Sequence, residues 1–379
     1  MHSPGAMLVA GGRIKRIGAP REVEAGLDRT IETLDFADCV IVPGFVDAHT
    51  HPLFAGDREP DFAARQAGKN PPLGMLYTVA QTRRMLENPA SLRAFWEVVR
   101  ERLHTIARHG TTTMEVKTGY ALHKDGETQL LDLVDAHKNQ AGLPRLISTF
   151  LGAHALPPEF SAEEAFVDYL TEHLLPVARA HGAVYADAFC EPGFFSPAQT
   201  HRYLACAREH GLRLRVHCDE MAFGGAAEMA AKLGVDAVDH ANYIRTQDID
   251  AIVASGIVTV ACPATIEYLG LPKKAPVRTL LERGGAVALA SDYNPGTSPC
   301  FNLQTVAYFG RKYFGLSGAE ALYAVTRAAA HSLRADAGAL RIEGPADFVV
   351  LEIASPHEFG WQFGGNLARA VYRGGEAVA

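Results

Sequence analysis

The feature of this sequence that most limits its fold is a regular alternation of short β-like runs with helix-like runs from about residue 40 onward. The helix-like runs have apolar residues at helical spacing, as in LRAFWEVVRERLHTIARHG at 92–110, which ends in glycine. Such alternation is typical of βα units around a parallel sheet. The sequence therefore predicts an α/β fold built on a (β/α)8 barrel of the TIM type, with strands within residues 40–51, 111–120, 146–156, 184–193, 212–220, 235–243, 257–265 and 286–296.

The two ends of the chain have a different pattern. MLVAGGRIKRIGAP at 7–20, with its Gly-Gly turn, and RTIETLDFADC at 29–39 are typical of β-hairpins. GPADFVVLEIAS and ARAVYRGGEAVA repeat this pattern near the C-terminus. We therefore expect residues 1–42 and 341–379 to form a small β-sandwich domain beside a barrel domain of residues 43–340.

Composition excludes several classes of function. A formal net charge of −7 without basic clusters argues against a nucleic-acid partner. No apolar run approaches the roughly 18 residues of a membrane span, and the first residues lack the apolar core of a secretory signal. The six cysteines form no CxxC pair, which is typical of reduced thiols. We expect a cytoplasmic protein that acts on a small molecule.

Polar side chains stand where the β-like runs end, and the first run ends in His49-Thr50-His51. Residues i and i+2 of a strand point to the same side, so these two imidazoles can converge. A (β/α)8 barrel carries its chemistry at the carboxyl ends of its strands, so the other run ends belong to the same predicted site. Those ends carry Lys117, Tyr120, His154, Glu191, His217, Asp219, Glu220, His240, Asp292 and Asn294.

Four of these residues can form a mononuclear metal site. Three nitrogens and one carboxylate are offered by His49, His51, His217 and Asp292. This set suits one divalent ion. Zinc is the expected ion, and iron and manganese are alternatives. An isolated HxH also occurs as two solvated loop histidines. Such an ion lowers the pKa of water, and Asp292 could accept the proton and pass it to the leaving group.

The neighbours of this set have predicted supporting roles. His240 could hydrogen-bond the attacking water or the developing oxyanion, although a single histidine at a strand end is often a core residue. Asp219 could contact a metal ligand without binding the ion itself. Asp239 could orient His240, and Lys117 could be a buried structural cation.

Five residues are candidates for substrate contact. Arg58, in AGDRE, could hold a carboxylate through two hydrogen bonds, or it could form an exposed salt bridge. Tyr120, His154 and Asn294 could line the barrel mouth, although the first two could also only pack there. Glu220 lies beside metal ligands, where a carboxylate is costly unless it pairs with a cationic or N–H-rich ligand, and it is also a candidate for catalysis.

At PGFVDAHTH, VHCDE, VDH and ASDYNPG the sequence resembles the amidohydrolase superfamily, metal hydrolases with a (β/α)8 barrel and a β-sandwich made from both termini. Within it, FAGDRE, GTTTMEVKTGYAL, STFLGAHALPPEF, DAFCEPGFFS and SDYNPGTSPCFNLQ are similar to the imidazolonepropionase family. Members of that family open the ring of 4-imidazolone-5-propanoate to give N-formimino-L-glutamate in histidine degradation. The matching blocks run in order from about residue 40 to residue 350.

The resemblance implies a role for each matching residue. The metal ligands would be His49, His51, His217 and Asp292. His240 would be the residue that activates water. The substrate contacts would be Arg58, Tyr120, His154 and Glu220. Related barrels with two metals carry a lysine on the fourth strand, which VYADAFCEPG lacks, so a single ion is expected. The resemblance also implies a homodimer.

Two departures from the family leave the substrate open. GKNPPLGMLYTVAQTR, residues 68–83, lacks the aromatic residue and the GGGI loop usual there, so segment 69–78 is altered, and Cys218 replaces a more usual alanine. We expect attack on C2 of a five-membered imidazolone-type ring that carries a propionate. An alternative is the desulfhydrase of ergothioneine degradation, which would release sulfide from 3-(5-oxo-2-thioxoimidazolidin-4-yl)propanoate and leave hydantoin propionate. Other cyclic amide or amidine hydrolases, deaminases and a metal-free binding protein on the same barrel are further alternatives.

Overall fold

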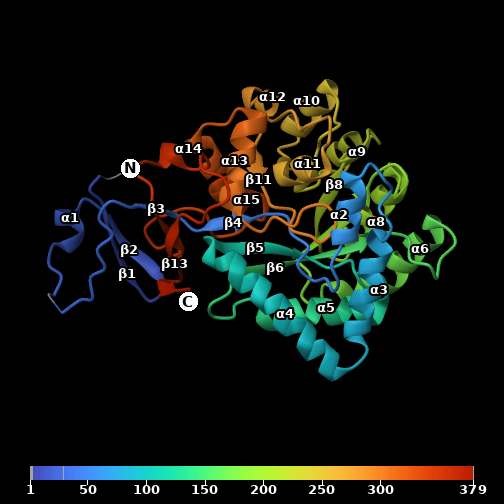
Figure 1. Ribbon diagram of the computed structural model, residues 1–379, viewed down its shortest axis with the longest axis horizontal. Coiled ribbons are helices and arrows are strands. Elements are labelled where there is room, and N and C mark those ends of the chain that lie inside the picture. The colour runs from blue at the N-terminus through green and yellow to red at the C-terminus, as the bar shows by residue number, and fades with distance from the viewer. Residues whose placement is uncertain (1–2, 29, 379) are drawn as a thin grey trace.

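A computed structural model describes residues 3–28 and 30–378, and its main body is a parallel barrel surrounded by helices (Figure 1). Eight parallel strands follow one another in chain order around the sheet, which confirms the predicted (β/α)8 architecture. Each predicted run matches one of them, and only β6 extends beyond its run, by one residue at its start. The strands are β4 (Phe45–Asp47), β5 (Thr111–Lys117), β6 (Arg145–Ala153), β7 (Tyr185–Cys190), β8 (Arg213–Cys218), β9 (Ala237–His240), β10 (Val258–Ala261) and β11 (Val287–Leu289).

The barrel closes beyond the ends of its first and last strands. Thr50 and Tyr293 form an isolated parallel bridge, and the backbone N–H of His51 donates to the carbonyl of Tyr293 at 2.9 Å. The N–H of Asp292 donates in turn to the carbonyl of His49 at 2.9 Å. The segments that follow β4 and β11 are therefore paired directly, at the end of the barrel where the polar residues lie.

Helices cover the outside of the barrel, and the one predicted at 92–110 is the C-terminal part of α4 (Pro89–Arg108). It begins where the side chain of Asn88 accepts hydrogen bonds from the N–H groups of Ala90 and Ser91. No helix among the described residues is both long and apolar enough for a membrane span. The other helices are α1 (Pro20–Glu24), α2 (Glu59–Gln66), α3 (Gly74–Leu86), α5 (Lys124–His137), α6 (Glu163–Tyr169), η1 (Leu170–Leu174), α7 (Leu175–Ala178), α8 (Pro197–Glu209), α9 (Ala226–Leu233), α10 (Thr246–Ala254), α11 (Pro263–Leu269), α12 (Val277–Glu282), α13 (Leu303–Phe314), α14 (Gly318–Tyr323), η2 (Ala324–Ala328), α15 (Ala329–Ser332) and η3 (Pro356–Glu358).

Both ends of the chain form antiparallel sheets beside the barrel, on the left in Figure 1. β1 (Ala6–Ala10) and β2 (Arg13–Gly18) form a hairpin whose predicted turn places Gly11 and Gly12 at positive φ. The other sheet has the order β14 (Glu376–Ala377), β13 (Ala368–Arg373), β12 (Phe348–Leu351) and β3 (Val40–Pro43). Backbone hydrogen bonds from Ile14 to Gly344 and from Ala346 to Gly12 join the hairpin to the segment that leads into β12.

The structure differs from the sequence-based expectation at two places near the N-terminus. Residues 30–39 form turns and irregular chain instead of a hairpin. The first β-like run also divides at Gly44, because β3 pairs with β12 in the terminal sheet and only β4 enters the barrel. A side chain at position 44 would overlap Thr112 on β5, so the chain can pass from one sheet to the other there only as glycine. The limits of the two domains stay a prediction.

Phe359 ties the C-terminal segment to the barrel. It is fully buried, and its ring packs on Phe45 of β4 with centroids 5.2 Å apart. Phe359→Ala should therefore lower the free energy of unfolding by about 3–5 kcal/mol, the usual loss for a large core side chain. Chemical denaturation measures this change, with Phe363→Ala, on a side chain that is 64% exposed, as the control. An equal effect of both variants would contradict this role for Phe359.

Candidate metal centre and active site

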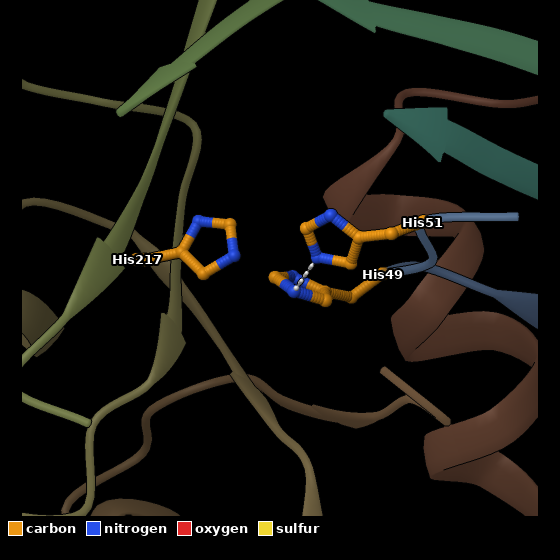
Figure 2. A group of neighbouring side chains, drawn as sticks. All are labelled: His49, His51 and His217. Atoms are coloured by element: carbon orange, nitrogen blue, oxygen red, sulfur yellow. Dashed lines mark hydrogen bonds between the residues drawn. The ribbon is translucent and has the colours of Figure 1, made fainter. Parts of the chain in front are cut away.

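Three histidines converge at the closed end of the barrel (Figure 2). His49 and His51 follow β4, and their Nε2 atoms lie 3.1 Å apart. His217, on β8, faces them across the barrel, and one ring nitrogen from each of the three lies within 4.8 Å of the others. All three side chains are buried. Three buried imidazole nitrogens this close together are a typical donor set for a metal ion.

Asp292 completes this group from the last strand. Its Oδ1 atom lies 3.3 Å from Nε2 of His49 and 3.4 Å from Nε2 of His51. The hydroxyl of Thr265 donates to the other carboxylate oxygen at 2.7 Å. Asp292 has a φ of 53°, a strained conformation that the barrel-closing hydrogen bond to His49 holds in place. The four residues predicted as metal ligands are thus brought together.

The charges beneath this group also suit a divalent cation. Lys117 and Arg215 are fully buried together with the carboxylates of Glu115, Asp187 and Asp239, which leaves one excess negative charge. Asp292 raises the excess to two. Such a buried negative excess is costly unless it is neutralised, in part by a proton on His49 or fully by a divalent ion among the histidines. The residues present therefore fit a single divalent metal.

Two of these buried carboxylates hold the metal-facing histidines. Oδ2 of Asp239 lies 2.7 Å from Nδ1 of His49, and Oδ2 of Asp187 lies 3.0 Å from Nδ1 of His217. Lys117 contacts both carboxylates, at 3.3 and 2.7 Å from Nζ. Each arrangement leaves the Nε2 side of a ring free for an ion. Asp239 was expected to orient His240, and this expectation is wrong because its carboxylate contacts His49.

Electrostatics at His49 agree with this arrangement. Burial and the Lys117 ammonium both oppose protonation of His49, but the carboxylates of Asp239 and Asp292 outweigh them and raise its pKa to about 9. At Asp292, burial favours the neutral acid, yet hydrogen bonds from His49 and His51 hold the carboxyl pKa well below its usual value. The centre therefore favours positive charge next to an ionised carboxylate.

His240 and Glu220 lie against each other beside the histidine group. Nε2 of His240 is 3.6 Å from Oε2 of Glu220, and neither ring nitrogen of His240 has a hydrogen-bond partner among the described residues. Burial lowers the pKa of His240 to about 4. Burial, together with the charges of Asp292 and Glu191, raises the pKa of Glu220 well above its usual value. A neutral imidazole and a carboxylic acid thus face the site.

The backbone around Glu220 is firmly held. Both carboxylate oxygens of Glu191 accept hydrogen bonds from the N–H groups of residues 220–222, at 2.7–3.0 Å. The side chain of Asn242 donates to the carbonyl of Glu220 at 3.1 Å. The position of the Glu220 side chain is therefore set by two neighbouring strand ends.

His154 and Tyr120 form one wall of the site. The ring of His154 stacks on His51, with centroids 5.4 Å apart, and Tyr120 packs against both rings. Nδ1 of His154 lies 2.9 Å from the carbonyl of Gly119, so Nδ1 carries the proton and donates. Burial and the neighbouring His51 lower the pKa of His154 to about 3, which leaves Nε2 as an acceptor.

Arg58 stands at the rim of the site, just before α2. Its Nε and Nη2 atoms each lie 2.6 Å from Oδ2 of Asp61, and its side chain is largely buried. The charges of Asp292 and Arg58 both act on the hydroxyl of Tyr120, which lies between the metal group and the rim. The predicted exposed salt bridge is thus a mostly buried pair beside the barrel mouth.

Three predicted site residues have other roles. The amide of Asn294 bonds to the carbonyl of Asp292 and to backbone and side-chain atoms of residues 296 and 297, so it shapes its own loop, and its substrate contact stays a prediction. Asp219 accepts hydrogen bonds from the N–H groups at the start of α9. Cys218 is buried in the core between the barrel and its helices, so it does not face the ring-binding side.

Sequence reasoning missed the residues that lie one layer below the site. Glu115, Asp187, Arg215 and Thr265 contact the metal-facing side chains or the cations that hold them. For Glu115 and Arg215 the signal in the sequence is a charged residue inside an apolar strand, two positions from another charged or polar residue, Lys117 and His217 respectively. Side chains at this spacing share one side of a strand, here the interior of the barrel. Thr265 lies in α11 and has no such signal.

Comparison with known proteins gives a consistent result. Residues 55–379 match the amidohydrolase family. An imidazolonepropionase from Rubrobacter xylanophilus is 38% identical, covering 98% of this chain and 90% of the relative, and one from Solibacter usitatus is 35% identical, covering 99% and 90%. A solved atrazine chlorohydrolase variant from Arthrobacter aurescens, in complex with zinc and atraton, has the same fold, with a TM-score of 0.73 at 18% identity, covering 98% of this chain and 89% of that one.

Asp187→Asn should weaken metal binding by about 10- to 100-fold, because the contact that orients His217 loses its charge. Competition with a chromophoric chelator measures the affinity, and thermal unfolding at saturating metal shows whether the fold persists. Asp132→Asn is the matched control, because Asp132 lies 2.7 Å from His181 in an Asp–His pair on the surface. Equal metal affinity in the Asp187→Asn variant and the unaltered protein would show that Asp187 serves only the fold.

Proposed function

Because the chain belongs to the amidohydrolase family, we propose that it hydrolyses 4-imidazolone-5-propanoate to N-formimino-L-glutamate with one divalent metal ion, zinc first. The observation that carries this proposal is the convergence of His49, His51, His217 and Asp292 in a chain that is 38% identical to an imidazolonepropionase over nearly its full length. Arg58, at the rim of the same site, supplies a cation for the propionate. The homodimer stays a prediction.

The metal would be held by His49, His51, His217 and Asp292, with Asp239 and Asp187 behind two of the imidazoles. Zinc suits three nitrogens and one oxygen, and the related fold in complex with zinc is consistent with this choice. When bound, such an ion supplies Lewis acidity, which makes water a nucleophile near neutral pH and polarises a carbonyl group.

Atom balance sets which bond breaks. In N-formimino-L-glutamate the former ring carbonyl carbon, C4, is the α-carboxylate, and C2 remains as the formimino carbon between two nitrogens. The oxygen of water must therefore bond to C4, and the bond between C4 and N3 must break with transfer of a proton to N3. The point of attack is thus C4, in place of the C2 that we expected from the sequence.

Two side chains of the centre would transfer the proton and stabilise the oxyanion in this step. Asp292 is ionised, because the hydrogen bonds from His49 and His51 outweigh burial, so it can take a proton from water and return it to N3. His240 is neutral and its ring nitrogens are without partners among the described residues, so it can donate a hydrogen bond to the oxyanion that develops on the C4 oxygen.

The remaining side chains would bind the substrate. Glu220, whose carboxyl pKa burial raises well above its usual value, can hydrogen-bond a ring nitrogen. Nε2 of His154 can accept from the other ring N–H, and Tyr120 packs beside it. Arg58 would pair with the propionate. An anionic tail and a flat ring with N–H groups match one cation at the rim and polar neutral groups inside.

The desulfhydrase is not proposed. The relatives at 33–38% identity that span nearly the whole chain are imidazolonepropionases, a name that refers to the imidazolone ring and not to a thioxo ring. One of the two departures that suggested it, Cys218, lies in the core away from the ring side. The altered segment 69–78 remains as a difference at the rim.

The function is tested by an assay of the metal-loaded protein with 4-imidazolone-5-propanoate, following N-formimino-L-glutamate by mass. Incubation in 18O-water should place one heavy oxygen in the α-carboxylate. The 2-thioxo analogue serves as the comparison substrate, with sulfide release as its readout. Absence of turnover of the imidazolone by protein with a full equivalent of metal would refute the proposal.

Asp292→Asn should lower kcat by about 10²–10⁴-fold, because the amide can neither accept the proton from water nor return it. Steady-state kinetics at saturating metal measure the change, and metal content is determined on the same sample. Asp250→Asn is the control, on an exposed carboxylate of α10. Activity of the Asp292→Asn variant within twofold of the control would remove Asp292 from proton transfer.

A further inference from the structure

Asp61 is the only buried side chain of α2, although it is a carboxylate. Its neighbours in the first turn, Glu59 and Pro60, are exposed. A carboxylate removed from water is costly unless every oxygen is paired. The partners of Asp61 therefore indicate what this burial serves.

One set of partners belongs to Arg58. Both Nε and Nη2 of Arg58 lie 2.6 Å from Oδ2 of Asp61, so this edge of the guanidinium is fixed by charge-assisted hydrogen bonds. The opposite edge, with Nη1, stands beside Gly296 in the loop after Asp292. A side chain at position 296 would overlap Nη1. Asp61 and Gly296 together thus direct the free edge of Arg58.

The other set of partners belongs to the start of α3. Leu73 and Gly74 donate their backbone N–H groups to Asp61, at 2.8 and 3.2 Å. Leu73 occupies the N-cap position of α3, where its own side chain can accept no hydrogen bond. Asp61 therefore caps a helix other than its own, and holds the middle of the altered segment 69–78 in place.

The capped segment forms part of a cavity near the site. Residues 73–76 line a cavity of about 360 Å³ together with Ala155 and Leu156, which directly follow His154, and with Phe194. Phe194 packs on Phe189 at 4.4 Å between ring centroids, and Phe189 in turn packs on His154. One buried carboxylate thus joins the cation at the rim to a cavity wall that adjoins the ring-binding side.

We propose that Asp61 is the positioning residue for recognition of the substrate carboxylate, an inference that rests on the proposed function. It holds the Nε and Nη2 edge of Arg58, so that the Nη1 edge is presented to the carboxylate at a fixed angle beside Gly296. The same carboxylate orders the start of α3. A guanidinium that is already ordered loses less conformational entropy when the ligand binds.

The direction in which KM changes when Asp61 loses its charge distinguishes positioning of Arg58 from simple Coulomb attraction. Removing the negative charge of Asp61 leaves Arg58 without its counter-ion, which by Coulomb attraction alone would strengthen binding of an anion. If Asp61 acts by positioning, its removal must instead weaken binding of the carboxylate. The two effects therefore predict opposite changes in KM.

Asp61→Asn keeps the shape of the side chain and removes its charge. In the full-length, metal-loaded protein, KM for 4-imidazolone-5-propanoate should rise roughly tenfold, the size of one lost charge-assisted hydrogen bond, while kcat changes by less than about twofold. KM for the methyl ester of the substrate, which lacks the charge, should not change. Amide hydrogen exchange of residues 73–76 should become faster.

Two further variants keep the test decisive. Asp57→Asn makes the same chemical change on an exposed neighbour and should leave KM for both compounds within twofold. Gly296→Ala crowds Nη1 without touching Asp61, and should raise KM for the acid but not for the ester. This second variant supplies the answer if Asp61→Asn does not fold.

The outcomes separate this proposal from the proposed function. If the unaltered protein does not hydrolyse the imidazolone, the function itself fails. If it does, and Arg58→Ala abolishes the preference for the acid over the ester while Asp61→Asn and Gly296→Ala preserve it, Arg58 binds the tail without positioning and the inference is overturned. A fall in KM for the acid in Asp61→Asn would overturn it as well.

Discussion

The closure of the barrel between its first and last strands is the constraint on which the site depends. The carbonyl of His49 accepts from the N–H of Asp292, and the N–H of His51 donates to the carbonyl of Tyr293. These bonds join segments more than 240 residues apart in the sequence, and they bring two imidazoles and one carboxylate to the same point. Metal binding would add a further link across this joint, so the stability of the barrel and the geometry of the centre are coupled.

A second constraint comes from the charges buried inside the barrel. Lys117 lies among carboxylates from β5, β7 and β9, two of which contact His49 and His217. Replacing one of these groups leaves the others unpaired in a medium that solvates charge poorly. This explains why polar residues occupy strand interiors that would otherwise be apolar. The carboxylates that offset the buried cations also determine which ring nitrogens of His49 and His217 face the ion.

The sequence was sufficient for features that depend on local pattern. Seven of the eight strands lie within the predicted runs and β6 begins one residue before its run, because buried parallel strands and their polar ends have a clear signature. The residues proposed as ligands lie together because parallel strands end at one side of a barrel. Contacts between distant segments could not be read in this way. Spacing gave no sign that Asp239 contacts His49 instead of His240, or that Asp61 caps α3.

The rim and the metal-facing group are held by different parts of the chain, and this separation bears on how specificity can change. The ligands belong to the barrel strands and their closure, whereas Arg58, Asp61 and the segment before α3 belong to helices inserted between β4 and β5. The two are joined by side-chain contacts such as the Arg65 bond to the carbonyl of Gly296. A shortened segment at 69–78 can therefore alter the cavity beside His154 while the chemistry of the centre is preserved, because the bonds that position the ligands do not pass through it.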